Sequence, residues 1–224
     1  MRVWLVGAIL LGLASQGRAA SPVVVELFTS QGCSSCPPAD AVLRDLAGRP
    51  DVLALGFHVT YWNGLGWRDP FSFDNATRRQ EGYRRLLGIE TVYTPQMVVQ
   101  GRSEMVGSDR RAVAAAIAAA ERVSGPEIRL TRAVGDGLQV DIGTGRGAAT
   151  VLLVGYDPRH VTPVGRGENE GRTLEEANVV RSLRPIGNWN GASITLSVPL
   201  PLGERTAILL QAEDGRILAA GRQQ

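Results

Sequence analysis

The chain has 224 residues, of which 44% are hydrophobic and 21% are charged, a profile typical of a globular protein of one or two domains. Its formal net charge is +2, and without Arg2 and Arg18 of the N-terminal segment it contains 22 basic and 22 acidic residues. A neutral chain lacks the excess of positive charge that nucleic-acid binding requires, so the composition gives no basis for that function.

The first 19 residues have the pattern of a secretory signal peptide. Arg2 precedes an apolar run over residues 3–14, and small residues at Gly17 and Ala19 indicate cleavage after Ala19. The alternative is an uncleaved anchor, but a dozen apolar residues are short for a membrane span of roughly 20. We therefore expect a secreted or periplasmic protein that meets the membrane only during export.

Buried strands alternate with helices in the first half of the remaining chain. The expected order is a strand at 23–28, a helix at 36–48, a strand at 51–59, a loop at 60–74, a helix at 75–88, a hairpin at 94–107 and a helix at 108–123. Pro is tolerated in the first turn of the helix at 36–48, and Ser108 or Asp109 is suited to cap the last one. This order predicts a mixed sheet flanked by helices.

The pattern changes after residue 124. About seven short β segments follow, and Asp-Gly turns connect two pairs of them. A long polar segment at 156–178 interrupts the strands. We predict an α/β domain at 20–124 and an all-β, sandwich-like domain at 125–224.

Cys33 and Cys36 are the only cysteines, and an exported compartment permits a disulfide between them. Because this disulfide closes a very short loop, it removes little entropy from the unfolded chain. Stabilisation of the fold is therefore a weak reason for the disulfide to be present. At a helix N-terminus, unpaired N–H groups favour a thiolate, which would make Cys33 the nucleophile and Cys36 the resolving cysteine. A structural staple and half of a metal site are the alternatives.

The segments "VVVELF", "CSSCPP" and "LGIETVYTPQMVVQG" resemble the thioredoxin superfamily. The resemblance implies a thioredoxin-like fold for the first domain and a cis peptide bond at Pro95, beside the disulfide, with Thr94 contacting a bound peptide. It also implies that Glu26 is a buried acid that exchanges protons with Cys36. A carboxylate simply hydrogen-bonded to neighbouring backbone is the alternative for Glu26.

Over nearly its whole length, the chain also resembles a family of secreted bacterial proteins catalogued as a domain of unknown function. Four segments carry this resemblance: "ELFTSQGCSSCPPAD", "FHVTYWNGLGWRDPF", "VYTPQMVVQG" and "VGRGENEGRTLEEANVV". It implies a thioredoxin-like fold with a β-rich C-terminal partner, and no substrate.

Several other residues are candidates for a ligand rim. Trp62 and Trp67 lie in an aromatic, Gly-rich loop that could form a groove, or could pack that loop onto the sheet. His58 ends a strand and could lie near the disulfide, or serve only as a hydrogen-bonded structural residue. The polar segment offers a further set, with a surface loop held by its own ion pairs as the alternative: Arg159, His160, Arg166, Glu168, Asn169 and Arg172.

These patterns predict an exported thiol–disulfide oxidoreductase acting on protein or small-thiol substrates. Its partner would be another protein's cysteines or a membrane reductase, and it would need no cofactor beyond the disulfide. The alternative is a non-enzymatic binding protein or a copper chaperone, whose soft ligands would come from Cys33, Cys36, His58 and His160. The sequence leaves the substrate, the redox direction and the oligomeric state open.

Overall fold

A computed structural model describes residues 21–120, 125–133 and 135–223. The predicted signal peptide at 1–19 and the predicted boundary at residue 124 lie outside the described residues. The elements in chain order are β1 (Val23–Thr29), α1 (Pro37–Ala47), β2 (Val52–His58), α2 (Asp74–Leu87), β3 (Gln96–Val99), β4 (Ser103–Val106), α3 (Arg110–Ala119), β5 (Ile128–Arg132), β6 (Gly137–Ile142), β7 (Ala149–Pro163), β8 (Thr173–Trp189), β9 (Ile194–Pro199), β10 (Arg205–Gln211) and β11 (Ile217–Arg222).

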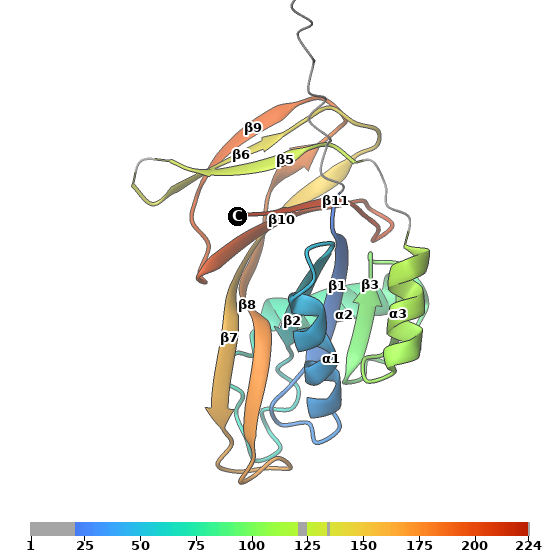
Figure 1. The fold of residues 1–224 in the computed structure, drawn as a ribbon, viewed down its shortest axis with the longest axis vertical. Helices are drawn as coiled ribbons and strands as arrows, with labels where there is room; N and C mark the ends of the chain where they lie inside the picture. Colours follow the sequence, from blue (N-terminus) through green and yellow to red (C-terminus); the bar gives the residue numbers. More distant parts are fainter. Residues whose placement is uncertain (1–20, 121–124, 134, 224) are drawn as a thin grey trace, which may run out of the picture.

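One mixed sheet of eight strands runs through both halves of the chain, in the order β11-β10-β7-β8-β2-β1-β3-β4 (Figure 1). The halves join where β8 lies parallel to β2, with Gly56 opposite Val179. The predicted architecture, a thioredoxin-like α/β domain plus an all-β sandwich, is therefore wrong. The described part of the chain is mostly β, with only three helices, and its largest sheet belongs to neither half alone.

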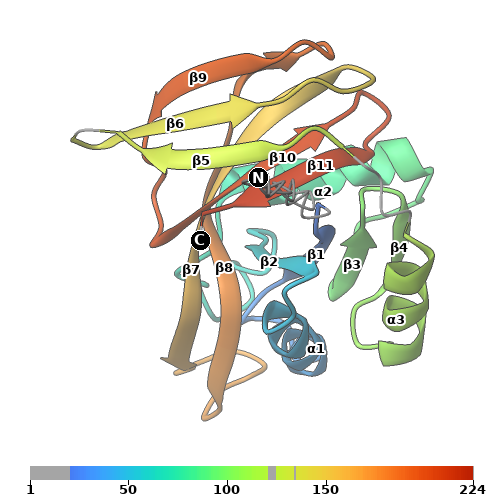
Figure 2. The ribbon, with the colours of Figure 1, turned by 45° about the horizontal axis from the view of Figure 1, so that its top comes forward.

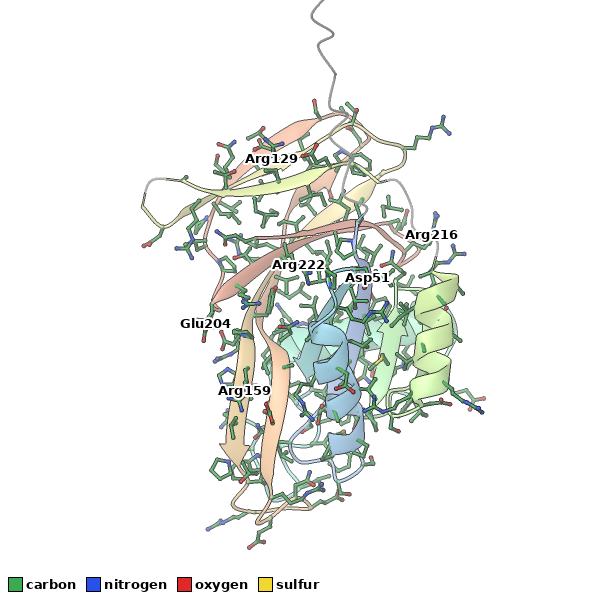
Figure 3. The ribbon with its side chains drawn as sticks, viewed as in Figure 1. Asp51, Arg129, Arg159, Glu204, Arg216 and Arg222 are labelled. Atoms are coloured by element: carbon green, nitrogen blue, oxygen red, sulfur yellow. A yellow bond between two sulfur atoms is a disulfide. The ribbon has the colours of Figure 1, made fainter. Side chains whose placement is uncertain are left out.

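The error arises largely from the polar segment at 156–178, which was expected to interrupt the strands. It forms instead the outer part of a long antiparallel β7–β8 hairpin, and only residues 164–172 connect the two strands. The sequence of this hairpin is hard to recognise as two strands, because charged residues occupy both exposed and buried positions along it. Arg159 of β7, labelled in Figure 3, pairs with Glu175 of β8 at 2.8 Å, whereas Asp157 and Glu176 are buried.

The predicted order of strands and helices up to α3 is confirmed, and the two faces of β1 explain how the helices pack. Val23, Val25 and Leu27 face a core cluster that includes residues of α1 and α3. Val24 and Phe28 face the opposite cluster, which includes Tyr83 of α2. Successive side chains of β1 point to opposite faces of the sheet, and both faces are covered by helices. The sequence of β1 is therefore an almost continuous apolar run rather than an alternation of apolar and polar residues.

A second sheet, in the order β5-β6-β9, covers one end of the large sheet (Figure 2). Its inward residues, such as Leu138 and Val140, form a third cluster with Val151 of β7 and Ile208 of β10. This face-to-face packing is the part of the sandwich prediction that the structure supports. Arg222 of β11 joins this end to the turn before β2, because its guanidinium donates to the carbonyls of Pro50 and Val52 at 3.0 Å each (Figure 3).

Candidate active site around the Cys33–Cys36 disulfide

Cys33 and Cys36 form a disulfide in the turn between β1 and α1. Cys36 is the N-cap residue of α1, which has Pro37 and Pro38 in its first turn, and Cys33 lies in the turn before the helix. Both cysteines are 0% exposed, whereas Ser34 and Ser35 between them are exposed. The Ser35 hydroxyl lies 3.3 Å from Cys33 Sγ. The disulfide is thus covered, and its two intervening serines face solvent.

Gln31 connects this turn to three distant segments. Its backbone N–H donates to Asp69 Oδ2 (2.8 Å), and its side-chain amide donates to Glu176 Oε2 (2.9 Å). Its amide oxygen accepts a hydrogen bond from Trp67 Nε1 (3.0 Å), and its carbonyl accepts one from Asn169. Gln31 therefore ties the turn to the 59–73 loop, to β8 and to the β7–β8 loop.

Four buried ionisable groups lie on the α1 side of the sheet. Thr29 and His58 are opposite each other at the carboxyl ends of β1 and β2. The Thr29 hydroxyl donates to Asp40 Oδ1 (2.8 Å), and the backbone N–H of Asp40 donates to the carbonyl of Cys36 (3.1 Å). His58 Nδ1 is 2.7 Å from Asp69 Oδ2, and its Nε2 is 3.9 Å from Glu176 Oε1. We call Asp40, His58, Asp69 and Glu176 the acidic cluster.

The protonation of the acidic cluster follows from burial and from its single cation. Burial alone lowers the pKa of His58, but the charges of Asp69 and Glu176 and the hydrogen bond to Asp69 raise it to about 9. Burial would raise the pKa of Asp69, but the charge and hydrogen bond of His58 hold it below its usual value. Burial raises the pKa of Glu176, and it raises the pKa of Asp40 to about 7. At neutral pH, His58 and Asp69 form an ion pair, and Asp40 is poised to exchange a proton.

Glu26, expected beside Cys36, lies instead on the α2 side of β1. Its carboxylate forms an ion pair with Arg79, which contacts it through Nε and through Nη2, the latter at 2.9 Å. The Tyr83 hydroxyl also donates to Glu26 Oε1 (2.7 Å). The structure therefore does not bring Glu26 together with the disulfide.

The aromatic loop between β2 and α2 lies against the disulfide turn. A Cβ atom on Gly32 would be 3.3 Å from Trp62 Cβ, and Trp62 Nε1 donates to Thr94 Oγ1 (2.8 Å). The Thr94–Pro95 peptide bond is cis, as expected. Pro95 and Ala39 of the first turn of α1 both pack on Gly107. Trp62 and Trp67 thus contact the turn, and Thr94 is joined to it through Trp62.

Residues 164–172 connect β7 and β8 and lie against the same turn. Asn169 is fully buried and donates through Nδ2 to the carbonyls of Gln31 and Cys33, at 2.9 Å each. The backbone N–H of Ser34 donates to Glu168 Oε2 (2.9 Å). Arg166 is exposed, and its side chain makes no hydrogen bond or ion pair within the described part of the chain.

The two histidines are both engaged with carboxylates. His58 pairs with Asp69, and His160 Nε2 lies 2.7 Å from Asp157 Oδ2, close to Arg181 and Phe71. Across residues 21–120, 125–133 and 135–223, no group of three or more His, Cys, Asp or Glu side chains has an arrangement that could hold a metal ion. None of the helices in these ranges is long and apolar enough to span a membrane.

Sequence reasoning missed Gln31, Asp40, Asp69 and Glu176. Asp40 gives a weak signal, because an acid four residues after Cys36 lies one helical turn along α1. Asp69 and Glu176 give none, because each lies in a charged or loop-like stretch that reads as exposed. Their burial depends on partners in other elements: the Gln31 side chain contacts Glu176, 145 residues away, and the Gln31 backbone N–H donates to Asp69, 38 residues away.

Comparison with known protein families identifies one family. Residues 24–211 match the family described as "Protein of unknown function (DUF1223)". The chain belongs to the DUF1223 family. No curated protein matches it.

Two solved structures share the fold of this DUF1223 protein. A crystal structure of a protein from Agrobacterium tumefaciens is 34% identical, with a TM-score of 0.79, covering 91% of this chain and 94% of that one. The structure of HBP35 of Porphyromonas gingivalis is 14% identical, with a TM-score of 0.62, covering 91% of this chain and 75% of that one. The second likeness concerns the fold alone.

Proposed function

We propose that this DUF1223 protein is an exported thiol–disulfide oxidoreductase that uses Cys33 and Cys36 on protein or small-thiol substrates. The observation that carries the proposal is the Cys33–Cys36 disulfide at the start of α1, one helical turn from a buried carboxyl group, Asp40, whose pKa is about 7. Kinship with the thioredoxin superfamily belongs to this proposal only for the local unit of β1, the turn and α1, and not for the architecture.

In the reducing direction, the Cys33 thiolate attacks one sulfur of a substrate disulfide. The substrate S–S bond breaks, a Cys33–substrate mixed disulfide forms, and the first substrate sulfur leaves as a thiolate. Cys36 then loses its proton to the Asp40 carboxylate and attacks Cys33 Sγ. This step restores the Cys33–Cys36 disulfide and releases the second substrate thiolate, so the substrate gains two electrons and the protein loses them. The oxidising direction is the reverse.

Asp40 takes the role that sequence reasoning gave to Glu26. Its backbone N–H already contacts the Cys36 carbonyl, and the hydroxyl of Thr29 fixes its carboxyl group. A group with a pKa near the working pH exchanges protons most effectively in both directions. Glu26 is held by Arg79 and Tyr83 on the other face of the sheet and has no part in the proposed reaction.

Exchange also requires movement at the turn. Both cysteines are 0% exposed, and an attacking sulfur must reach Cys33 Sγ directly. The groups around the turn, Trp62, Trp67, Thr94 and Glu168, are then those that a substrate meets as the turn opens. We further infer secretion or a periplasmic location, with a cysteine-containing protein or a membrane reductase as the redox partner.

The test is the redox equilibrium of the purified protein against a glutathione series, with Cys33→Ser and Cys36→Ser variants beside it. We expect a potential between about −270 and −120 mV, the range of related dithiol enzymes. We also expect Cys36→Ser, and not Cys33→Ser, to trap mixed disulfides. A pair that stays oxidised far below this range, or two variants that trap nothing, would refute the exchange mechanism and favour a binding role.

A further inference from the structure

Side chains of the β7–β8 loop hydrogen-bond to the backbone of the disulfide turn. Asn169 Nδ2 donates to the carbonyls of Gln31 and Cys33, and Glu168 accepts the N–H of Ser34. All three contacts therefore involve backbone atoms within residues 31–34. The Ser34 side chain also forms a hydrogen bond with Glu168. These contacts hold the loop and the turn in one joint conformation.

The loop itself is fixed in place. Arg172 Nη1 donates to Asn169 Oδ1 (2.9 Å), which orients the buried amide. Val164 and Arg172 pair through the backbone at 2.9 Å, and Gly171 donates to the Val164 carbonyl at the same distance. Gly167 has a φ of 80°, and a Cβ atom there would lie 3.1 Å from Trp67 Cβ. A loop closed in this way places the carboxylate of Glu168 at a defined point.

The position of the Glu168 carboxylate affects the chemistry of Cys33. The unpaired N–H groups before and at the start of a helix are the donors that stabilise a cysteine thiolate. Ser34 directly follows Cys33, and its N–H is occupied by Glu168. The carboxylate thus removes one donor, and it adds a negative charge close to the turn in which the thiolate forms.

We propose that Glu168 is a positioning residue that lowers the reactivity of Cys33, by occupying the Ser34 N–H and by opposing a thiolate electrostatically. The β7–β8 loop thereby limits the reactivity of the Cys33–Cys36 pair. In its biological meaning this inference rests on the proposed function, but the effect on the Cys33 thiol can be measured whether or not the protein exchanges disulfides.

Other charges also face the turn. Asp40 approaches it from α1, and Arg172 approaches it through Asn169. Asp69 and Glu176 contact Gln31, and His58 lies behind them. Variants of Glu168 leave all of these groups in place, so any change in the Cys33 thiol comes from the charge and the hydrogen bond of Glu168.

The experiment is a titration of Cys33 in a Cys36→Ser background, following thiolate absorbance against pH. Glu168→Gln removes the charge and keeps an acceptor, and Glu168→Ala removes both. Glu170→Gln is the matched control, because Glu170 is exposed in the same loop and its carboxylate makes no hydrogen bond or ion pair among the described residues. Far-UV circular dichroism should be unchanged, since Glu168 is exposed.

We expect the pKa of Cys33 to fall by about half a unit in Glu168→Gln, and further in Glu168→Ala, with no change in Glu170→Gln. Below the pKa, half a unit is about a threefold rise in thiolate. The rate of reaction with a small disulfide should rise only about twofold, because nucleophilicity falls with pKa. At 1 M salt the difference for Glu168→Gln should shrink, because an exposed charge is screened.

Equal Cys33 pKa values in the parent and both Glu168 variants would overturn the inference, and so would an equal fall in Glu170→Gln. The two proposals fail separately. A protein that never exchanges with glutathione contradicts the proposed function, even if Glu168 governs the thiol. A protein that exchanges normally, with a Cys33 pKa indifferent to Glu168, contradicts only the inference.

Discussion

Two buried groups of ionisable residues lie on opposite faces of the same pair of strands. On the α2 side, Glu26 of β1 contacts Arg79 and Tyr83. On the α1 side lies the acidic cluster, anchored by His58 at the end of β2 and by Asp40 next to Cys36. Both groups are shielded from water, but their charges balance differently.

Glu26 has a matched partner. One carboxylate faces one guanidinium, and the tyrosine hydroxyl donates to the same carboxylate, so its negative charge is matched by one cation and one hydrogen-bond donor. The acidic cluster has three carboxyl groups and one imidazole. Burial makes so many negative charges costly, and the pKa values of Asp40 and Glu176 are raised as a result. A buried acid is thus suited to proton transfer where its charge is unmatched, rather than merely where it is buried.

The largest expected effect comes from breaking the matched pair. Arg79→Met should lower the free energy of unfolding by about 3–5 kcal/mol, because it leaves the Glu26 carboxylate buried without its partner. The measurement is urea unfolding of the oxidised protein. Glu26→Met in the Arg79→Met background should recover much of this loss, because it removes the orphaned charge.

Arg79→Met and the parent protein also test whether the α2 side of the sheet affects the reactivity of Cys33. Under conditions where Arg79→Met is folded, its Cys33 thiol should titrate as in the parent protein. A shifted titration would connect the two faces and break the comparison.

A smaller effect concerns the pH dependence of stability. The pKa of His58 is about 9 in the folded protein and about 6.5 in the unfolded chain, so the folded state binds the extra proton. This contribution is fully present below pH 6.5 and is lost as pH rises to about 9. We expect the free energy of unfolding to fall by about 2–3 kcal/mol across that window.

His58→Gln provides the control for this prediction. It should be less stable than the parent at pH 6, because Asp69 loses its cationic partner. Its stability should fall by much less than that of the parent between pH 6.5 and 9, because the His58 contribution is absent and the remaining contribution of Asp40, with a pKa of about 7, is small in this window. A parent protein whose stability is flat across this window would show that His58 is not a charged partner of Asp69.

Sequence reasoning succeeded where a feature depends on neighbours along the chain. The disulfide loop, the helix that follows it and the apolar run of β1 all follow from local patterns, and their order along the chain was right. Trp62, Trp67, Thr94 and Glu168 were also expected near Cys33, and each lies beside the turn. What stays untested for them is a role in binding.

Sequence reasoning failed where a feature depends on distant pairing. The β7–β8 hairpin resembled a loop because two of its acidic residues are buried: Glu176 contacts Gln31, 145 residues away, and Asp157 contacts Arg181 and the backbone N–H of Glu204. That reading concealed the junction of β8 with β2 and led to two separate folds. Glu26 was chosen for its place on the first strand, but the alternation of side chains along β1 turns it away from α1.

The smallest expected change in stability comes from Asp40→Asn, and it is the most informative about function. Burial raises the pKa of Asp40 from 3.8 to about 7, so the folded state keeps a proton that the unfolded chain has lost. This proton favours folding below pH 3.8, and the advantage disappears as pH rises through 7. Asparagine resembles the protonated acid and can still accept the Thr29 hydroxyl. We therefore expect Asp40→Asn to change the free energy of unfolding by less than about 1 kcal/mol at pH 5.

The resolving step of the Asp40→Asn protein should nevertheless slow, by on the order of 100-fold at pH 7, because Cys36 loses its proton acceptor. Glu26→Gln, a change of the same kind on the other face, should leave that step unaltered. If both variants slow it equally, the two faces do not differ in function, whatever their charges.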